Sequence, residues 1–277
     1  MLWVLVGLPL FLLLTCGGCM LIYLVLPLPP TDVLVLGVDA RPGEGYVTRT
    51  DSVILVGIQP PAQISLLSIP RDVFISVPEY GLERINAVNV LGEMEQVGYG
   101  PELLKQSIAL SFGVQVEHYV RLNFQAFEDL IDAVGGVTIN VERAIVDDFY
   151  PTDDYNTQQV RFEVGEQHMD GATALIYART RHSDDDYFRA ERQQQVVEAF
   201  TRKLINPLTW PAVLSVLTRA VDTDLSPFDM LRIAPAVLAG AGQMERLVID
   251  REYIRPIERG AAPDYEKLNP WIEAHFD

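Results

Sequence analysis

The first feature of the sequence is a long apolar run at its N-terminus. Residues 2–28 are dominated by Leu, Val, Phe, Ile and Gly, and the first charged side chain is Asp32. About 20 apolar residues suffice to span the hydrocarbon core of a bilayer. A cleaved signal peptide would instead have a basic start and a small-residue cleavage site, and neither stands out here. The pattern predicts one transmembrane anchor over residues 1–30.

Short apolar runs bounded by turn residues come next. Residues 31–37, 52–58 and 64–69 predict three strands, because each run is followed or preceded by Gly, Pro or Asp. In an antiparallel meander, Asp39 ends the first strand, Asp51 begins the second and Arg71 follows the third. These three residues would then lie together at one edge of the sheet.

The remaining pattern alternates between helical and strand periodicity. Helices are predicted over residues 101–110, 124–134, 171–177, 187–205, 211–220 and 226–238, and strands over residues 118–122, 137–141, 160–164 and 247–254. Residues 147–158 are predicted to form a polar loop, and residues 184–186 supply aspartates that could cap the long helix. The mixture predicts an α/β fold, with residues 31–277 forming a single-domain α-β-α sandwich around a mixed, largely antiparallel sheet.

Charge and cysteine content argue against two classes of site. The formal net charge of −17 falls entirely on the part of the chain after the apolar run, whereas a duplex-binding protein needs a basic face. Nucleic acid is therefore not an expected partner. Cys16 and Cys19 are the only cysteines, and no further ligand accompanies them. A zinc or redox centre is not favoured.

The first candidate site is a pair of aspartates. Asp39 and Asp51 flank one loop that contains Pro and Gly. Two carboxylates at one sheet edge could hold Mg²⁺, which commonly takes one or two protein carboxylates together with phosphate oxygens and water. Aspartates beside such loops are also frequent turn formers, so this pair alone does not establish a metal site.

The second candidate site is a group of arginines near the long predicted helix. Arg189, Arg192 and Gln193 are spaced i, i+3 and i+4, so they share one helix face, and Arg179 and Arg181 come shortly before. Guanidinium groups can clamp a pyrophosphate with paired hydrogen bonds. The same arginines could instead form ion pairs with the nearby acidic residues, Asp184, Asp185, Asp186 and Glu191.

Eight short motifs occur in order along the chain. They are LGVDAR at 36–41, RTDS at 49–52, SIPRD at 68–72, RINA at 84–87, DAVGGV at 132–137, GEQHMDG at 165–171, ALIYARTR at 174–181 and RAERQQ at 189–194. In this order, over residues 32–205, the sequence resembles the LytR-CpsA-Psr family, whose members usually also carry an N-terminal membrane anchor. Residues 206–277 add further helices and a strand after this motif core.

The resemblance implies a transferase at the outer face of the bacterial cytoplasmic membrane. Such an enzyme is a Mg²⁺-dependent phosphotransferase that moves a glycosyl-phosphate unit from a polyprenyl-pyrophosphate carrier to a hydroxyl of peptidoglycan or a related cell-wall polymer. The chemistry suits arginines and a cation, because phosphoryl transfer depends mainly on positioning and charge neutralisation. The lipid tail would lie in an apolar tunnel, which we expect residues 103–110 and 196–205 to line.

The resemblance also assigns roles to individual residues. The implied catalytic residues are Arg71, Arg179, Arg181 and Asp51, the implied substrate-binding residues are Arg49, Arg84, Arg189, Arg192 and Gln193, and the implied metal ligands are Asp39 and Asp51. The general base stays open among Asp39, Asp51 and Asp72. Phe188 departs from the family, which often has Gly at this position.

Three other functions remain compatible with the same residues. A non-catalytic binder of polyprenyl phosphates would need the same arginines, and a pyrophosphatase would differ only in using water as the acceptor. A membrane-bound transcriptional attenuator is also possible, although the acidic net charge does not favour contact with DNA.

Overall fold

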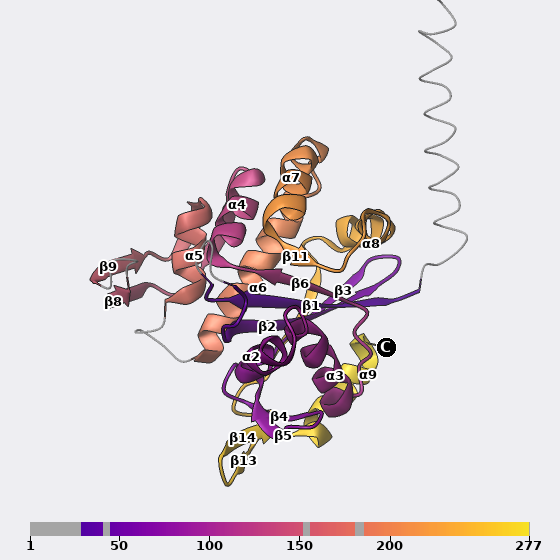
Figure 1. The fold of residues 1–277 in the computed structure, drawn as a ribbon. Helices are drawn as coiled ribbons and strands as arrows, with labels where there is room; N and C mark the ends of the chain where they lie inside the picture. The colour runs from indigo at the N-terminus through magenta and orange to yellow at the C-terminus, as the bar shows by residue number, and fades with distance from the viewer. Residues whose placement is uncertain (1–28, 41–44, 152–155, 181–185, 277) are drawn as a thin grey trace, which may run out of the picture.

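A six-stranded mixed sheet lies at the centre of the structure. The structure, a computed structural model, describes residues 29–40, 45–151, 156–180 and 186–276. The strand order is β11-β6-β1-β2-β3-β12 (Figure 1). The strands are β1 (Thr31–Val38), β2 (Thr50–Gln59), β3 (Gln63–Ser68), β6 (His118–Leu122), β11 (Asp222–Thr223) and β12 (Met244–Val248).

The predicted meander is confirmed. β1 pairs antiparallel with β2, and β2 pairs antiparallel with β3, so that Leu55 lies between Leu34 and Leu67. β11 is antiparallel to β6, whereas β1 pairs with β6 and β3 pairs with β12 in parallel. The sheet is therefore mixed, as the sequence predicts.

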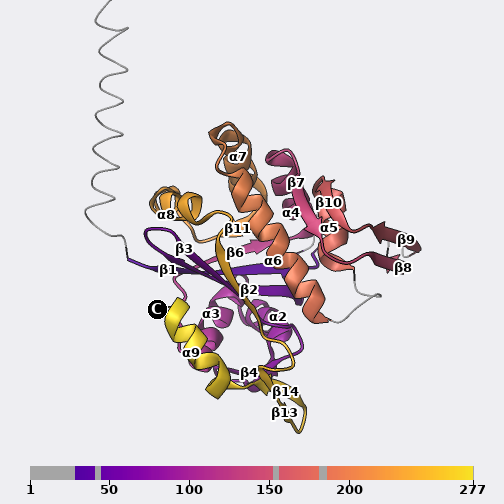
Figure 2. The ribbon, with the colours of Figure 1, turned by 180° about the vertical axis from the view of Figure 1, so that it is seen from behind.

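Helices cover both faces of this sheet (Figures 1 and 2). One face carries α2 (Ile85–Glu95), α3 (Gly100–Phe112) and α9 (Tyr265–His275), and the other lies beneath α4 (Phe124–Ala133), α5 (Gly171–Arg179), α6 (Asp186–Lys203), α7 (Trp210–Ala220) and α8 (Pro227–Gly240). Successive side chains of β1 point alternately to the two faces, as expected for a strand between two helical layers. Leu34 and Leu36 join the core beneath α2 and α3, whereas Val33 and Val35 pack near α8. Burial on both faces explains why β1 is an almost continuous apolar run.

A second core forms beside the sheet, around α4, α5 and α6. Two two-stranded sheets border it: β7 (Val137–Val141) pairs with β10 (Gly165–Met169), and β8 (Ile145–Pro151) pairs with β9 (Thr157–Phe162). Phe162 of β9 packs against Tyr177 of α5, with ring centroids 5.2 Å apart. The prediction that residues 147–158 form a polar loop is therefore wrong, because most of that segment belongs to β8 and β9.

Other differences from the sequence-based prediction lie mostly at the ends of the sheet. Sequence patterns missed α2, α9 and the hairpins β4 (Phe74–Val77) with β5 (Gly81–Arg84) and β13 (Ile254–Ile257) with β14 (Gly260–Pro263). The single strand predicted over residues 247–254 is also wrong, since β12 ends at Val248 and a turn precedes β13. The strands of both hairpins have only four residues each, so their periodicity is weak.

The predicted anchor falls almost wholly outside the described residues, which begin at residue 29. Within the described part of the chain, no helix combines the length and apolar character needed to cross a membrane. The predicted capping aspartates at 184 and 185 also lie outside the described residues, as does Arg181.

Candidate active site

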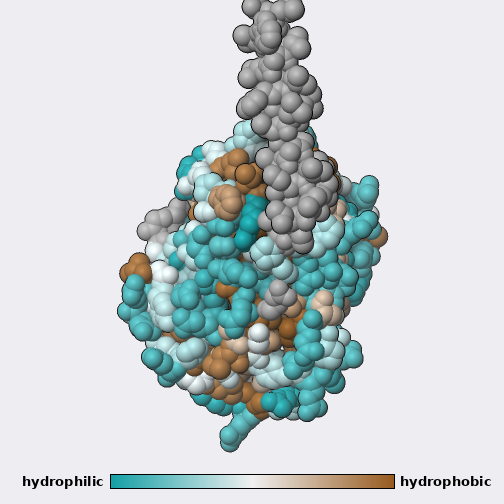
Figure 3. Space-filling model, turned by 90° about the vertical axis from the view of Figure 1, so that its right-hand side faces the viewer, coloured by the Kyte–Doolittle hydropathy of each residue, from teal (hydrophilic) through white to brown (hydrophobic). Residues whose placement is uncertain are grey.

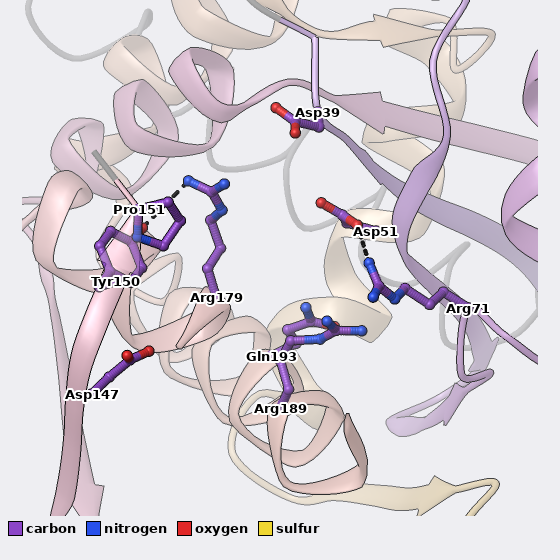
Figure 4. Close-up of a pocket in the computed structure, with 9 residues that line it drawn as sticks. All are labelled: Asp39, Asp51, Arg71, Asp147, Tyr150, Pro151, Arg179, Arg189 and Gln193. Carbon is purple, nitrogen blue, oxygen red and sulfur yellow. Dashed lines mark hydrogen bonds and ion pairs between the residues drawn. The ribbon is translucent and has the colours of Figure 1, made fainter. Parts of the chain in front are cut away.

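A cavity of about 300 Å³ opens at one edge of the central sheet (Figure 4). Its two walls come from different parts of the fold. The sheet wall carries Asp39, Asp51 and Arg71, and the helical wall carries Asp147, Tyr150, Pro151, Arg179, Arg189 and Gln193.

The sheet wall follows from the meander. Asp39 comes directly after β1, and Arg71 comes shortly after β3. Asp51 is the extra residue of a β-bulge, because Gly37 pairs with Ser52 and Val38 pairs with Thr50. A bulge locally redirects the strand and its side chains. Figure 4 shows Asp39 and Asp51 facing the same open space.

An ion pair links two members of the sheet wall. Arg71 Nη1 donates a hydrogen bond to Asp51 Oδ1 at 3.0 Å. Both side chains are partly exposed, so the pair contributes little to stability. Its consequence is geometric, since it places a guanidinium and a carboxylate side by side at the mouth of the cavity.

A buried polar network holds the segment that precedes Asp51. Asn89 Nδ2 donates to the carbonyl oxygens of Tyr46 and Thr48, both at 2.8 Å. Arg121 stacks on the Tyr46 ring at 3.9 Å and donates to Glu93 at 2.6 Å. Residues 46–48, just before Asp51, are therefore held from α2 and β6.

Electrostatics keep this network charged. Burial opposes the charge of Glu93, but the Gly98 N–H and the Arg121 guanidinium outweigh burial, and the pKa of Glu93 is lowered. Arg121 also binds Asp222 at 2.7 Å, which balances the second carboxylate. Burial, followed by the nearby Asp222, raises the pKa of Tyr119 to about 12.

The helical wall presents arginines from α5 and α6. Arg179, the last residue of α5, stacks on Phe124 at 3.9 Å and donates to the Tyr150 hydroxyl at 3.3 Å. Arg189 and Gln193 lie one helical turn apart on α6 and both line the cavity. A planar guanidinium held by stacking is well oriented for paired hydrogen bonds to phosphate.

Side-chain hydrogen bonds fix α6 in place. Gln194 donates to Ser68 Oγ and to the Leu247 carbonyl, both at 2.9 Å, which attaches α6 to β3 and β12. The Tyr177 hydroxyl donates to Gln195 at 2.6 Å, which attaches α5 to α6. These contacts set the position of the neighbouring Gln193 and of Arg189.

Arg192 does not line the cavity. Its guanidinium is buried and donates to the main-chain carbonyls of Tyr177 at 3.0 Å and Thr180 at 2.5 Å. Arg189 and Arg192 therefore do not both point into the cavity as predicted: Arg189 lines the cavity, whereas Arg192 contacts α5. A direct contact of Arg192 with substrate stays a prediction that this geometry does not favour.

The other predicted site residues are scattered. Arg49 is exposed and does not line the cavity. Arg84 is also exposed, and it lies 3.9 Å from Asp72 and over the Phe74 ring. For the metal, the described residues contain no group of three or more His, Cys, Asp or Glu side chains arranged so that they could hold an ion. Asp39 and Asp51 are thus a two-carboxylate candidate.

Sequence reasoning missed the part of the helical wall that β8 supplies. Asp147 and Tyr150 both face the cavity because the β8–β9 pairing shifts register between them. The Thr180 hydroxyl donates to the buried Asp147 at 2.7 Å. Ile, Val, Phe and Tyr among the aspartates of this segment were a strand signal, but the shift breaks the simple alternation that reveals a strand.

The expected lipid tunnel is not formed by the two predicted stretches together. Leu103, Leu104 and Ile108 of α3 are buried in the core on one face of the sheet. Val196 and Ala199 of α6 belong to the core on the other side. Because the sheet separates them, one channel cannot be lined by both.

Carboxylates facing arginines across a cavity suit a phosphate ligand with a bound cation. The chain belongs to the LytR_cpsA_psr family, whose model matches residues 28–262.

Two curated proteins illustrate the similarity in sequence. The polyisoprenyl-teichoic acid–peptidoglycan teichoic acid transferase TagU of Oceanobacillus iheyensis is 35% identical over 216 residues, covering 76% of this chain and 63% of TagU. Regulatory protein MsrR of Staphylococcus aureus is 32% identical over 201 residues, covering 70% and 56%. The chain thus spans less than two thirds of either relative.

The fold is also that of a solved relative. TagT bound to LIIa-WTA superposes with a TM-score of 0.67 at 21% identity, covering 89% of this chain and 91% of TagT. At this identity the likeness shows the fold alone. The α/β architecture with a mixed sheet is therefore confirmed.

Proposed function

We propose that this protein transfers a glycosyl-phosphate unit from a polyprenyl-pyrophosphate carrier to a hydroxyl of peptidoglycan or a related cell-wall polymer. The cavity in which Asp39 and Asp51 face Arg179 and Arg189 is the observation that carries this proposal. Family membership supports it, and so does the name of the TagU relative, which describes transfer of a polyisoprenyl-linked polymer to peptidoglycan.

The reaction needs no covalent enzyme intermediate. The acceptor oxygen attacks the phosphorus that carries the glycan, and the bond from that phosphorus to the bridging oxygen breaks. Polyprenyl phosphate leaves as a stable anion, and the hydroxyl proton passes to a base or to solvent. What the protein must supply is orientation and positive charge near the pyrophosphate.

The helical wall provides that charge. Arg179 and Arg189 would hold the pyrophosphate oxygens, with Gln193 donating a further hydrogen bond from the same face of α6. Stacking of Arg179 on Phe124 fixes its plane before substrate arrives, so less conformational freedom is lost on binding. Arg71 would approach the same group from the sheet wall.

The sheet wall fits Mg²⁺ by the chemistry of its donors. Asp39 and Asp51 are hard oxygen ligands at one side of the cavity, and phosphate oxygens and water would complete the coordination. When bound, Mg²⁺ would neutralise charge on the pyrophosphate. The ion pair with Arg71 holds Asp51 at the mouth of the cavity.

We further propose that residues 1–30 anchor the protein in the cytoplasmic membrane, with the cavity on the outer face. The apolar run over residues 2–28 has the required length and composition. This placement brings the cavity to the compartment in which a lipid-linked glycan and a cell-wall acceptor meet.

Purification from the native membrane followed by mass spectrometry tests the proposal. We expect a co-purified polyprenyl lipid with a phosphate or pyrophosphate head group, lost in Arg179→Ala. The exposed Arg161 of the β8–β9 hairpin provides a matched control, since Arg161→Ala should retain the lipid. Absence of any polyprenyl lipid from the wild type would contradict the proposal.

A transfer assay separates the alternatives. Synthetic lipid-pyrophosphate donor and a peptidoglycan oligomer should give a glycosylated phosphodiester product and polyprenyl phosphate. Release of free glycosyl phosphate in place of that product would identify a pyrophosphatase. Lipid retention with neither product would identify a non-catalytic binder.

A further inference from the structure

Large apolar side chains are exposed on α7, α8 and the single turn η1 (Pro207–Thr209) before α7. We call this set the α7–α8 surface; its members are Leu208 (85% exposed), Trp210 (42%), Leu214 (49%), Phe228 (73%) and Leu231 (72%). Trp210 and Leu214 are spaced i, i+4, and Phe228 and Leu231 are spaced i, i+3. Each pair therefore shares one face of its helix.

Both helices lie toward one end of the molecule. Figures 1 and 2 place α7 and α8 at the end opposite the β4–β5 and β13–β14 hairpins. In Figure 3, apolar side chains are visible at this end, and others lie lower on the same face. Exposed apolar patches on a protein surface commonly mark a binding partner or a membrane.

The start of β1 lies directly against α8. Arg232 Nη2 donates to Thr31 Oγ1 at 3.2 Å, and Pro29 and Thr31 line a small recess together with Ile233 and Ala236. The apolar run ends at residue 28. Three residues span at most about 11 Å, so α8 cannot lie far from the end of that run.

We propose that the α7–α8 surface inserts into the interfacial layer of the membrane that holds residues 1–30. This inference rests on the proposed membrane anchor. The Trp210 indole N–H donates to the Leu204 carbonyl at 2.7 Å, which leaves the exposed part of the ring apolar. Tryptophan with such an arrangement favours the bilayer interface.

Charge indicates the nature of this contact. The net charge of −17 lies outside the anchor and is repelled by anionic lipid headgroups. The surface therefore binds through apolar burial, and its insertion does not require anionic lipid. The helix α6 connects the cavity to this surface, because Arg189 near its start lines the cavity and its last residue, Lys203, shortly precedes η1. Insertion would therefore set the orientation of the cavity relative to the bilayer.

Quenching of tryptophan fluorescence in vesicles tests the insertion. The full chain with Trp3→Phe and Trp271→Phe retains Trp210 as its only tryptophan. We expect brominated phosphatidylcholine to quench this emission, with or without added phosphatidylglycerol. As a matched control, Tyr80→Trp in a chain that also has Trp210→Phe reports from the turn between β4 and β5 and should not be quenched. Absence of quenching at Trp210 would overturn the inference.

Activity gives a second readout, which depends on the proposed function, whereas the quenching does not. Phe228→Ser with Leu231→Ser should slow transfer from a membrane-embedded polyprenyl donor by about tenfold, because each change removes apolar area from the interface. Transfer from a short-chain, water-soluble donor should be unchanged, which also reports that the variant folds. Leu110→Ser, at an exposed position on α3, is the matched control.

The outcomes distinguish the two proposals. A wild type that transfers neither donor contradicts the proposed function, while the quenching result still decides whether the surface inserts. A double variant that keeps the full rate with the membrane-embedded donor, when the wild type transfers both donors, contradicts the inference.

Discussion

The two walls of the cavity differ in charge and in how they are built. The sheet wall carries two carboxylates and one guanidinium, Asp39, Asp51 and Arg71, at the ends of neighbouring strands. The helical wall carries two guanidinium groups, Arg179 and Arg189, one buried carboxylate, Asp147, and the uncharged Gln193. The difference indicates separate tasks, in which the sheet wall suits a cation and the helical wall suits an anion.

The two walls also differ in what fixes them. Main-chain pairing between strands places the residues of the sheet wall, and the Asn89 and Arg121 contacts hold residues 46–48 before Asp51. Side-chain hydrogen bonds place the helical wall, above all those of Gln194 and Arg192. A single substitution can therefore shift the helical wall more readily than the sheet wall.

The largest expected effect is on the helical wall. Arg179→Ala combined with Arg189→Ala should weaken donor binding by roughly a hundredfold or more, since each lost charge-assisted contact contributes about 1.5–3 kcal/mol. Calorimetric titration with a lipid-pyrophosphate donor measures this change, with Arg161→Ala as the control. Wild-type affinity in the double variant would contradict the proposal that this wall binds the anion.

A substitution at Arg192 sharpens the comparison within α6. Arg192→Met leaves the buried carbonyl oxygens of Tyr177 and Thr180 without their donor, so the free energy of unfolding should fall by about 1–3 kcal/mol. Arg189→Met should instead affect donor binding more than stability. Urea denaturation and donor titration of both variants provide the test. A variant of Arg192 that binds poorly but unfolds like the wild type would place Arg192 in the site.

The smallest expected effect is at Tyr150. Tyr150→Phe removes one hydroxyl that accepts from Arg179 at 3.3 Å, while Phe124 continues to support the guanidinium. This hydrogen bond is long and only orients the guanidinium, so its loss should lower donor affinity by about 1.5 kcal/mol or less, which is roughly tenfold or less. A loss as large as that of Arg179→Ala would show that Tyr150 itself contacts the substrate.

The sheet wall could be predicted from the sequence, whereas much of the helical wall could not. The apolar runs around Asp39, Asp51 and Arg71 locate strand ends, and the geometry of a meander then brings those ends together. Asp147 and Tyr150 were missed because a register shift in β8 disrupts the alternation of a strand. The sequence of β8 alone does not indicate how β8 pairs with β9, and this pairing contains the register shift.

Arg192 shows a second limit. Its spacing from Arg189 predicts a shared helix face, and the helix itself is present. Which side of that face meets the cavity depends on the angle at which α5 crosses α6, and packing in the second core sets this angle. Tertiary packing therefore decided the role of a residue whose local structure was predicted.

Transfer by Asp51→Asn, measured together with donor binding, tests the division of tasks most directly. With a lipid-pyrophosphate donor, a peptidoglycan oligomer and added Mg²⁺, we expect turnover to fall by about a hundredfold or more while donor affinity stays within about threefold of the wild type. Chelation of Mg²⁺ should lower wild-type turnover to a similar level. Wild-type turnover in Asp51→Asn with Mg²⁺ chelated would contradict the metal-binding role of the sheet wall.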